Sequence, residues 1–235
     1  MVLNQQTMII ISGASRNIGK FLFDHYQQNE LVFGTYHTTP PENTVKQKKL
    51  YKVDISDFNS VWNFFKQIES FLSEITLINC AGISYNSFAH KSDPEKWKKV
   101  IETNLIGTYN MIRVFLPIMR QQNYGRIINF SSVVAQKGTP GASPYAASKS
   151  GLWGLAKSLA QENGNRGITI NNINLGYVDM GMGIEQVPES YQTLIKDQIP
   201  TMKFCEPDDI FRTIEYLRNT SYINGSSIDL NGGLI

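Results

Sequence analysis

The segment Met8-Ile-Ile-Ile-Ser-Gly-Ala-Ser-Arg-Asn-Ile-Gly19 is the part of this chain that indicates its fold most clearly. Its apolar first half predicts a buried strand over Met8–Ser12, and the following turn leads directly into a helix that is expected to begin near Ile18. A helix N-terminus presents free N–H groups and a partial positive charge, while Gly13 and Gly19 allow a close approach to the backbone. The segment therefore predicts a phosphate-binding turn between a first strand and a first helix.

One position in this turn departs from the usual glycine pattern. Asn17 stands where a third glycine is expected. Asparagine tolerates left-handed backbone geometry better than other residues that carry a side chain, so the turn is expected to survive the change.

Short apolar runs recur along the rest of the chain and alternate with longer amphipathic stretches, which predict helices. The other expected strands are Leu31 to Tyr36, Leu50 to Val53, Ile75 to Asn79, Arg126 to Ser131, Thr169 to Leu175 and Ser227 to Leu230. A repeated strand and helix order favours a parallel sheet with helices on both faces, since right-handed crossovers place them there. The sequence thus predicts an α/β fold with one Rossmann-type doubly wound sheet, in a single domain spanning residues 1–235.

Helix punctuation supports this assignment. Asp93-Pro94-Glu95 predicts a helix start, and the helix is expected to reach about Met119; a second long helix is expected to start near Pro144. The stretch from Met180 to Cys205 has two early glycines, two prolines and only a short helical pattern. It predicts a substrate flap over residues 180–205 rather than a layer of the core.

Composition excludes several classes of function. The hydrophobic content of 41%, the charged content of 18% and a formal charge of +2 are ordinary for a soluble protein, so neither nucleic acid nor a membrane is expected as a partner. The basic run Lys46-Gln-Lys-Lys49 is interpreted as a solvated turn. Two cysteines and no long apolar N-terminal segment favour a cytoplasmic location, and no cluster of ligands at metal-binding spacing predicts a metal site.

Tyr145 and Lys149, in the run Ser143-Pro-Tyr-Ala-Ala-Ser-Lys149, lie four residues apart and share one face of the second long helix. A phenol beside an ammonium group can donate and accept a proton near neutral pH. The positive charge is expected to lower the pKa of the tyrosine from its usual value. The pair therefore predicts acid–base chemistry, although in isolation such a pair more often marks only an amphipathic helix face.

The preferred cofactor follows from the end of the second strand. Sites for NAD usually place an acidic residue there to hold the ribose 2′-hydroxyl, whereas this chain has Gly34-Thr-Tyr-His-Thr38. Arg16 in the turn offers the positive charge that a 2′-phosphate needs. Together with Tyr36 and His37, it favours NADP(H) over NAD(H).

Across nearly its whole length the chain resembles the short-chain dehydrogenase/reductase family, and most closely its 3-oxoacyl-[acyl-carrier-protein] reductase type. The motifs that carry the resemblance are Gly13-Ala-Ser-Arg-Asn-Ile-Gly19, Asp54-Ile-Ser-Asp57, Asn79-Cys-Ala-Gly82, Thr103-Asn-Leu105, Ser131-Ser132, Tyr145-Ala-Ala-Ser-Lys149 and Ile228-Asp-Leu-Asn-Gly-Gly233. The resemblance implies an NADPH-dependent oxidoreductase that reduces a carbonyl to a secondary alcohol.

The resemblance also implies a catalytic group of Asn104, Ser132, Tyr145 and Lys149. Tyr145 would protonate the substrate oxygen, Ser132 would hold that oxygen, Lys149 would lower the pKa of the tyrosine and bind the nicotinamide ribose, and Asn104 would hold a water molecule. Neighbouring residues at a strand end point to opposite sides, and the family spacing selects Ser132 rather than Ser131. By itself, Asn104 could equally be a buried helix residue satisfied by backbone groups.

For the cofactor, the resemblance places Asp54 and Ile55 beside the adenine, Asn79 to Gly82 along the ribose, and the Val178 backbone near the carboxamide. The full set expected at the cofactor is Gly13, Ser15, Arg16, Asn17, Ile18, Gly19, Tyr36, His37, Asp54, Ile55, Asn79, Cys80, Ala81, Gly82, Tyr145, Lys149, Gly176 and Val178.

Three further positions depart from the family pattern. Cys80 replaces a second asparagine, Leu175 replaces a proline, and Met180 replaces a threonine that contacts the cofactor in many members. We expect the threonine contact to be missing and the cofactor affinity or the flap to be altered in consequence.

The substrate is left open by the sequence. A carrier-bound 3-oxoacyl group would favour a basic mouth, but Gln121-Gln-Asn123 is neutral, although Arg126 and Arg166 are near it in sequence. A free small ketone, a quinone or a sugar-derived carbonyl is the alternative. A non-catalytic nucleotide-binding scaffold is the alternative of another class, and a hydrolase is disfavoured because the chain has no Gly-x-Ser-x-Gly elbow.

The resemblance implies a homotetramer or homodimer assembled through the two long helices, around residues 94 to 119 and 144 to 162. Trp153, Leu155 and Leu159 could belong to that interface or to the core, because both require an apolar helix face.

Overall fold

The computed structural model describes residues 7–41, 49–181, 184 and 187–235. In this part of the chain, seven parallel strands form one sheet in the order β3-β2-β1-β4-β5-β6-β7. The strands are β1 (Met8–Ser12), β2 (Leu31–Tyr36), β3 (Leu50–Lys52), β4 (Ile75–Asn79), β5 (Gly125–Ser132), β6 (Ile168–Leu175) and β7 (Ser227–Leu230). The chain order leaves the centre in both directions, which confirms the predicted doubly wound α/β fold.

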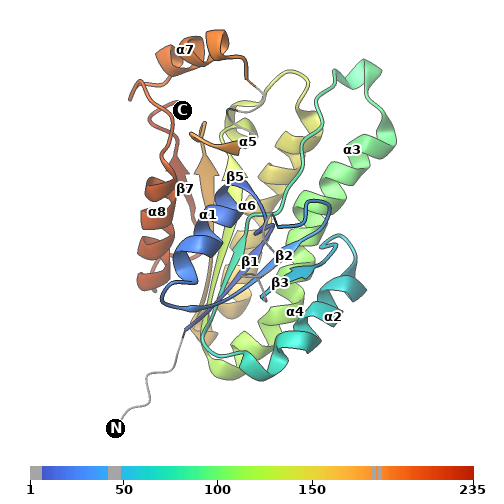
Figure 1. Cartoon of the computed structure of the whole chain (residues 1–235), viewed down its shortest axis with the longest axis vertical. Helices are drawn as coiled ribbons and strands as arrows, with labels where there is room; N and C mark the ends of the chain where they lie inside the picture. The colour runs from blue at the N-terminus through green and yellow to red at the C-terminus, as the bar shows by residue number, and fades with distance from the viewer. Residues whose placement is uncertain (1–6, 42–48, 182–183, 185–186) are drawn as a thin grey trace.

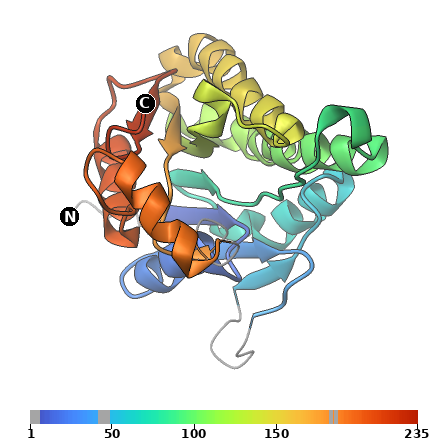
Figure 2. The same ribbon diagram turned by 90° about the horizontal axis from the view of Figure 1, so that it is seen from above.

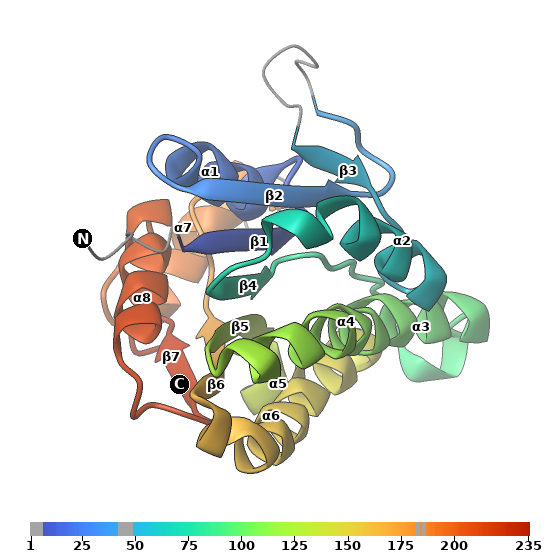
Figure 3. The ribbon, with the colours of Figure 1, turned by 90° about the horizontal axis from the view of Figure 1, so that it is seen from below.

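The main helices cover both faces of this sheet (Figures 1 and 3). The α-helices of the described residues are α1 (Asn17–Tyr26), α2 (Phe58–Ile68), α3 (Pro94–Ile101), α4 (Gly107–Gln122), α5 (Val134–Lys137), α6 (Ser143–Asn163), α7 (Glu189–Gln198) and α8 (Pro207–Asn219). Helices α1 and α8 lie on one face, while α2, α4 and α6 lie on the other. Shorter helical turns occur at Glu69–Phe71, Ala89–Lys91, Glu102–Ile106 and Gly164–Arg166.

The two faces of β1 show how the apolar run builds two cores at once. Met8 and Ile10 are buried among side chains of α2, α4 and α6, whereas Ile9 and Ile11 are buried among those of α1 and α8. Because side chains alternate across a strand, a run in which both faces pack against helices is apolar at successive positions, as Met8 to Ile11 are. Burying each such side chain contributes about 1.5–3 kcal/mol, so this short run stabilises both layers.

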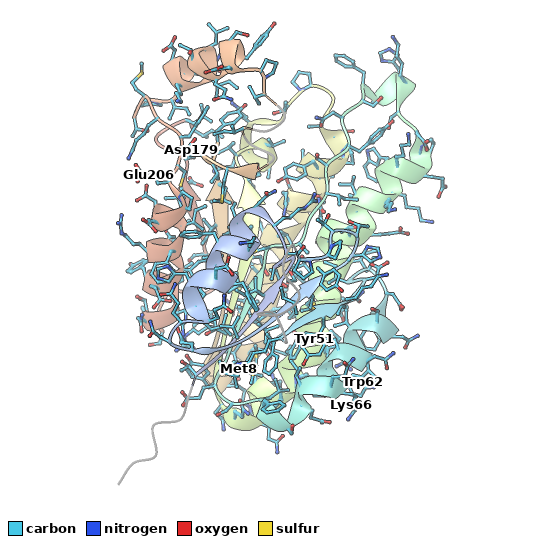
Figure 4. The ribbon with its side chains drawn as sticks, in the orientation of Figure 1. Met8, Tyr51, Trp62, Lys66, Asp179 and Glu206 are labelled. Carbon is cyan, nitrogen blue, oxygen red and sulfur yellow. The ribbon has the colours of Figure 1, made fainter. Side chains whose placement is uncertain are left out.

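The parallel strands all end at one edge of the sheet, and this edge carries the residues with chemical functions. In Figure 4, Met8 at the start of β1 lies at the lower end of the molecule and Asp179, shortly after β6, lies near the upper end. Helix α7 lies above the carboxyl ends of the strands (Figures 1 and 2). In open α/β sheets, ligands bind outside these carboxyl ends, so the upper edge is where a site is expected.

One predicted helix is divided in the structure. The helix expected from Pro94 to about Met119 consists of α3, a π-helical turn at Glu102–Ile106, and α4. Such π turns occur frequently at functional sites, and this one contains Asn104. The expected start is confirmed, since Asp93 accepts hydrogen bonds from the backbone N–H groups of Glu95 and Lys96.

The remaining strand and helix limits differ only slightly from expectation. Strand β5 extends one residue further at each end than predicted, β6 starts one residue earlier, and β3 ends one residue earlier. Within the predicted flap, residues 182–183 and 185–186 lie outside the described residues, as do residues 46–48 of the basic run. No helix in the described ranges is both long and apolar enough to cross a membrane.

Candidate active site

A cavity of about 720 Å³ opens at the carboxyl edge of the sheet. All of the residues predicted for the cofactor and the catalytic group line this cavity, with the exceptions of Asn79 and Asn104. The tertiary structure therefore brings residues from the first turn, the middle strands and α6 to one place. Their individual contacts show which of them are free to meet a ligand.

The phosphate-binding turn is shaped by close backbone packing. Gly13 has a positive φ of 70°, and a Cβ on it would lie 2.8 Å from the Ala81 Cα. A Cβ on Gly19 would overlap the carbonyl oxygen of Gly13. The N-cap residue of α1, Arg16, makes no side-chain capping hydrogen bond, which leaves the first-turn N–H groups available to a phosphate.

Asn17 keeps the turn intact and also contacts the start of the predicted flap. It has a φ of 51°, in the left-handed region that glycine and asparagine adopt most readily. Gly181 is buried at φ 66°, and a Cβ there would lie 2.7 Å from the Asn17 side chain. The asparagine that replaces the expected glycine thus fits against a glycine in the Met180–Gly181 segment.

At the other end of the cavity, the end of β2 carries no acidic side chain. Arg16 and His37 are exposed there, and the Asp54 carboxylate lies 3.6 Å from the His37 Nε2. Burial would raise the pKa of Asp54, but hydrogen bonds from the Ser56 backbone and hydroxyl and the charges of His37 and Lys99 hold it below its usual value. Its carboxylate is therefore charged at neutral pH and already has hydrogen-bond donors.

Tyr145 and Lys149 lie on the face of α6 that turns towards β5. The Lys149 ammonium donates a 2.6 Å hydrogen bond to the carbonyl oxygen of Phe130 and lies 5.6 Å from the centre of the Tyr145 ring. Lys149 is 6% exposed. Burial lowers the pKa of Lys149 to about 8, although the charge of the nearby Cys80 thiolate would act in the opposite direction.

The structure corrects the expected pKa of the tyrosine. Burial of the phenol raises the pKa of Tyr145, and a hydrogen bond with Ser132 opposes this shift. The direction differs from the expected lowering of the tyrosine pKa, because burial of the phenol outweighs the hydrogen bond with Ser132. Tyr145 is protonated at neutral pH, as a proton donor must be.

Ser131 and Ser132 serve different faces of β5. Ser132 forms the hydrogen bond with Tyr145 and accepts another from the Val134 N–H. Ser131 donates to the Lys149 carbonyl oxygen and accepts from the Trp153 Nε1, at 3.1 and 3.0 Å. Ser131 thus fastens α6 to the sheet. The spacing of residues in the sequence did not predict this contact.

Asn104 lies below the cavity, fully buried in the π turn. Its amide oxygen accepts from the Ile83 N–H at 2.8 Å, and its amide nitrogen donates to the Ile83 carbonyl oxygen and the Ser148 hydroxyl. The Ser148 hydroxyl donates in turn to the Tyr145 carbonyl oxygen. These contacts favour the interpretation of Asn104 as a buried residue satisfied largely by backbone groups, and they link the segment after β4 to α6.

Asn79 is also directed away from the cavity. Its amide nitrogen donates to Asn129, and Asn129 donates to Asn172, so that three asparagines in register cross β4, β5 and β6. Asn79, which was expected at the cofactor, is therefore not among the residues that line the cavity. Cys80 does line it, with burial raising the pKa of its thiol.

The two other departures from the family pattern lie close to the cavity as well. Leu175 and Met180 both line it and pack against the apolar core beneath α1 and α8. Leu175 retains a backbone role, because its carbonyl oxygen accepts from the Val133 N–H at 3.0 Å.

The cationic groups at the mouth differ from those that the sequence suggested. Arg126 is buried at the start of β5, at the opposite edge of the sheet, where it donates to the carbonyl oxygens of Gly125, Gly167 and Arg218. It therefore contributes nothing to a basic mouth. Lys96 and Lys99 of α3 line the cavity instead, a placement that helical spacing alone did not reveal.

The residues present fit a dinucleotide. The uncapped start of α1, the narrow turn at Gly13 and the cavity volume suit a bound pyrophosphate, and the adjoining adenosine end carries polar and cationic groups. In the described part of the chain, no group of three or more His, Cys, Asp or Glu side chains could hold a metal ion.

Comparisons with known proteins agree with this geometry. The family model of the short chain dehydrogenases matches residues 7–190. An acetoacetyl-CoA reductase of Shinella zoogloeoides is 35% identical over 233 residues, covering 95% of this chain and 96% of its own. A 3-oxoacyl-[acyl-carrier-protein] reductase FabG of Staphylococcus aureus (strain Mu50) is 33% identical over 238 residues, covering 96% of each chain. The chain therefore belongs to the short-chain dehydrogenase/reductase family and is an oxidoreductase of that family.

Proposed function

We propose that this enzyme is an NADPH-dependent reductase that converts the carbonyl of a 3-oxoacyl group into a secondary alcohol, with Tyr145 as the proton donor. The observation that carries the proposal is the hydrogen bond between Ser132 and Tyr145 beside the buried Lys149 ammonium, in the cavity that also contains the phosphate-binding turn. A proton donor, an oxygen-binding hydroxyl and a nucleotide site in one cavity support carbonyl reduction.

Each side chain has a defined task in this reaction. The nicotinamide, when bound, supplies the hydride that the carbonyl carbon receives. Ser132 and Tyr145 hold the carbonyl oxygen by hydrogen bonds, and Tyr145 gives up its proton as negative charge develops on that oxygen. Lys149 stabilises the phenolate that remains and holds a ribose hydroxyl. Asn104 keeps Ile83 and α6 in place and is the proposed holder of a water molecule.

The preference for NADP(H) rests on charge at the adenosine end. Arg16 and His37 line the cavity at the end of β2, and the residues Gly34 to Thr38 there carry no carboxylate. Asp54 is already engaged by Ser56. Asp54 and Ile55 then lie beside the adenine, and the Gly176 and Val178 backbone lies near the carboxamide.

The substrate class is supported by the named relatives. Acetoacetyl-CoA reductases and a 3-oxoacyl-[acyl-carrier-protein] reductase are all similar to this chain over most of its length. We therefore favour a 3-oxoacyl thioester over a free small ketone, a quinone or a sugar-derived carbonyl. The paired Ser132 and Tyr145 also oppose a purely nucleotide-binding scaffold, since a binding protein does not need a proton donor held in this way.

The assembly and the location of the enzyme complete the proposal. We expect one domain over residues 1–235, a homotetramer or homodimer, and a cytoplasmic location. Ile106, immediately before α4, and Tyr109, in its first turn, are each 44% exposed, which is compatible with an interface there. Trp153, in contrast, donates hydrogen bonds to Ser131 and Asn174.

Turnover of NADPH with a panel of carbonyl compounds tests the function directly. The panel contains acetoacetyl-CoA, a carrier-bound 3-oxoacyl chain, a free β-keto acid, a small ketone and a quinone. We expect the thioesters to be reduced with the highest kcat/KM. Tyr145→Phe is expected to lose nearly all turnover while its Kd for NADPH changes little. Retained turnover in that variant would contradict the proposed role of Tyr145, and activity confined to the small ketone or quinone would contradict the substrate class.

A further inference from the structure

Helix α3 carries three lysines within four residues, and only two of them face the cavity. Lys96 and Lys99 line it together with Val100 and Thr103, which lie three and four residues apart along the same helix face. Lys98 points elsewhere and forms an ion pair with Glu102 at 3.6 Å. One face of α3 is therefore a cationic wall of the cavity, defined by Lys96 and Lys99.

This wall is held in place by contacts on both sides. The Trp97 Nε1 donates to the Ser143 hydroxyl at 3.1 Å, which ties α3 to the start of α6 two residues before Tyr145. The Tyr85 hydroxyl accepts from the Asp93 N–H, and the Lys96 ammonium lies 5.8 Å from the centre of the Tyr85 ring. The two ammonium groups are thus carried on a positioned helix rather than on a loop.

Within the described residues, neither Lys96 nor Lys99 forms an ion pair. The charge of Lys99 contributes to lowering the pKa of Asp54, but this carboxylate already accepts two hydrogen bonds from Ser56. Two like charges one turn apart repel each other, so that an anion between them would relieve this repulsion. Arg16 and the phosphate-binding turn belong to other walls of the cavity, and the α3 lysines are additional to them.

We propose that Lys96 and Lys99 form a second phosphate-binding wall, separate from the glycine turn. The inference rests on the proposed function, because that reaction brings phosphate groups beyond the pyrophosphate of the dinucleotide. One source is the 2′-phosphate of NADP(H); the other is the phosphate of coenzyme A or of a phosphopantetheine arm that carries the 3-oxoacyl group. Lysine binds a phosphate as a point charge, without the fixed fork of arginine, and suits either source.

The experiment compares the double variant Lys96→Gln/Lys99→Gln with Lys98→Gln. The second is the control, since it removes one lysine charge from the same helix outside the cavity. Kd values for NADPH and NADH are measured by titration calorimetry without substrate. KM values are measured for acetoacetyl-CoA and for the N-acetylcysteamine thioester of acetoacetate, which has the same keto group and no phosphate.

If the wall binds a phosphate, the double variant raises the Kd or KM of one phosphate-bearing ligand about fivefold or more. This is the size expected for the loss of two solvent-accessible charge contacts. An effect on NADPH but not on NADH assigns the wall to the cofactor. An effect on acetoacetyl-CoA but not on the phosphate-free thioester assigns it to the substrate. In both cases the Lys98→Gln values stay at those of the wild type, and Lys96→Arg/Lys99→Arg restores binding.

Equal values for the double variant and Lys98→Gln in both comparisons would overturn the inference. In the same assays, turnover of the phosphate-free thioester by the double variant shows that the fold and the reaction are intact. The phosphate-binding inference can therefore fail while the proposed function holds. If no carbonyl is reduced by the wild type, the proposed function fails, and the calorimetric comparison of NADPH with NADH still decides whether the wall binds the cofactor phosphate.

Discussion

The ammonium group of Lys149 donates a hydrogen bond of 2.6 Å to the main-chain carbonyl oxygen of Phe130, near the end of β5. This contact joins α6 to the sheet edge where the substrate carbonyl is expected. It also leaves a charged group buried, with a pKa lowered to about 8. A hydrogen bond to a backbone carbonyl recovers only part of the hydration that a lysine loses on burial, which explains the lowered value.

The pKa of Lys149 predicts a pH dependence of stability. The unfolded chain keeps the ordinary value of 10.5, so between pH 8 and 10.5 it binds more protons than the folded chain. The contribution of Lys149 to the free energy of unfolding therefore increases as the pH rises through this window, by about 3 kcal/mol in total. Denaturant unfolding of the wild type and Lys149→Met at both ends of the window measures it.

Comparing the two proteins at each pH cancels the titration of other groups, such as Tyr145 and Cys80. The free energy of unfolding of the wild type should gain on that of Lys149→Met as the pH rises. A difference that stays constant from pH 8 to 10.5 would show that Lys149 keeps an ordinary pKa.

The adjacent serines are expected to separate catalysis from stability. Ser132→Ala removes the hydroxyl bonded to Tyr145, and a reduction of kcat of about 100-fold is expected, as for the loss of one donor to a developing oxyanion. Ser131→Ala removes the bonds to the Lys149 carbonyl and to Trp153, and is expected to cost roughly 1 kcal/mol of stability. Steady-state kinetics and thermal unfolding of both variants measure these effects; a larger loss of kcat in Ser131→Ala would reverse the assignment.

Substitutions at Asn17 test the left-handed turn. At a φ of 51°, Asn17→Ala is expected to destabilise the protein by roughly 1 kcal/mol more than Asn17→Gly. Asn123 has the same φ and lies at the C-terminus of α4, so Asn123→Ala and Asn123→Gly are matched controls for the backbone effect.

The same substitutions separate the turn from its contact with Gly181. If that contact matters, Asn17→Gly raises KM for the substrate or Kd for NADPH, whereas Asn123→Gly changes neither. Identical kinetics in the two glycine variants would mean that Asn17 serves the backbone turn only.

Cofactor choice is tested at Arg16. Arg16→Gln is expected to raise the Kd for NADPH about tenfold through the loss of a charge-assisted contact, while the Kd for NADH changes little. Fluorescence titration with both cofactors measures the ratio of the two Kd values. A wild-type enzyme that binds NADH as tightly as NADPH would refute the assignment of Arg16 and His37 to the 2′-phosphate.

Much of the fold could be predicted because a strand that is buried on both faces has a recognisable run of apolar residues. Largely apolar runs such as Met8–Ser12 and Ile75–Asn79 coincide with β1 and β4 to the residue. The glycine turn and the Tyr145–Lys149 spacing could also be recognised in the sequence, because each depends on residues that are close together in the chain. The π turn around Asn104 could not be recognised in this way, because the helical residue pattern continues through it from α3 to α4.

The order of strands and helices and the phosphate-binding turn could be predicted from residue patterns alone, and the resemblance to the family indicated the candidate catalytic side chains. The surroundings of these side chains became visible in the folded chain. The tertiary structure buried Tyr145 enough to raise its pKa, turned Asn79 and Arg126 away from the cavity, and brought Lys96 and Lys99 into it. The physical reason is that desolvation and electrostatic contacts depend on distances between segments far apart in the chain, whereas periodicity and turn chemistry are local.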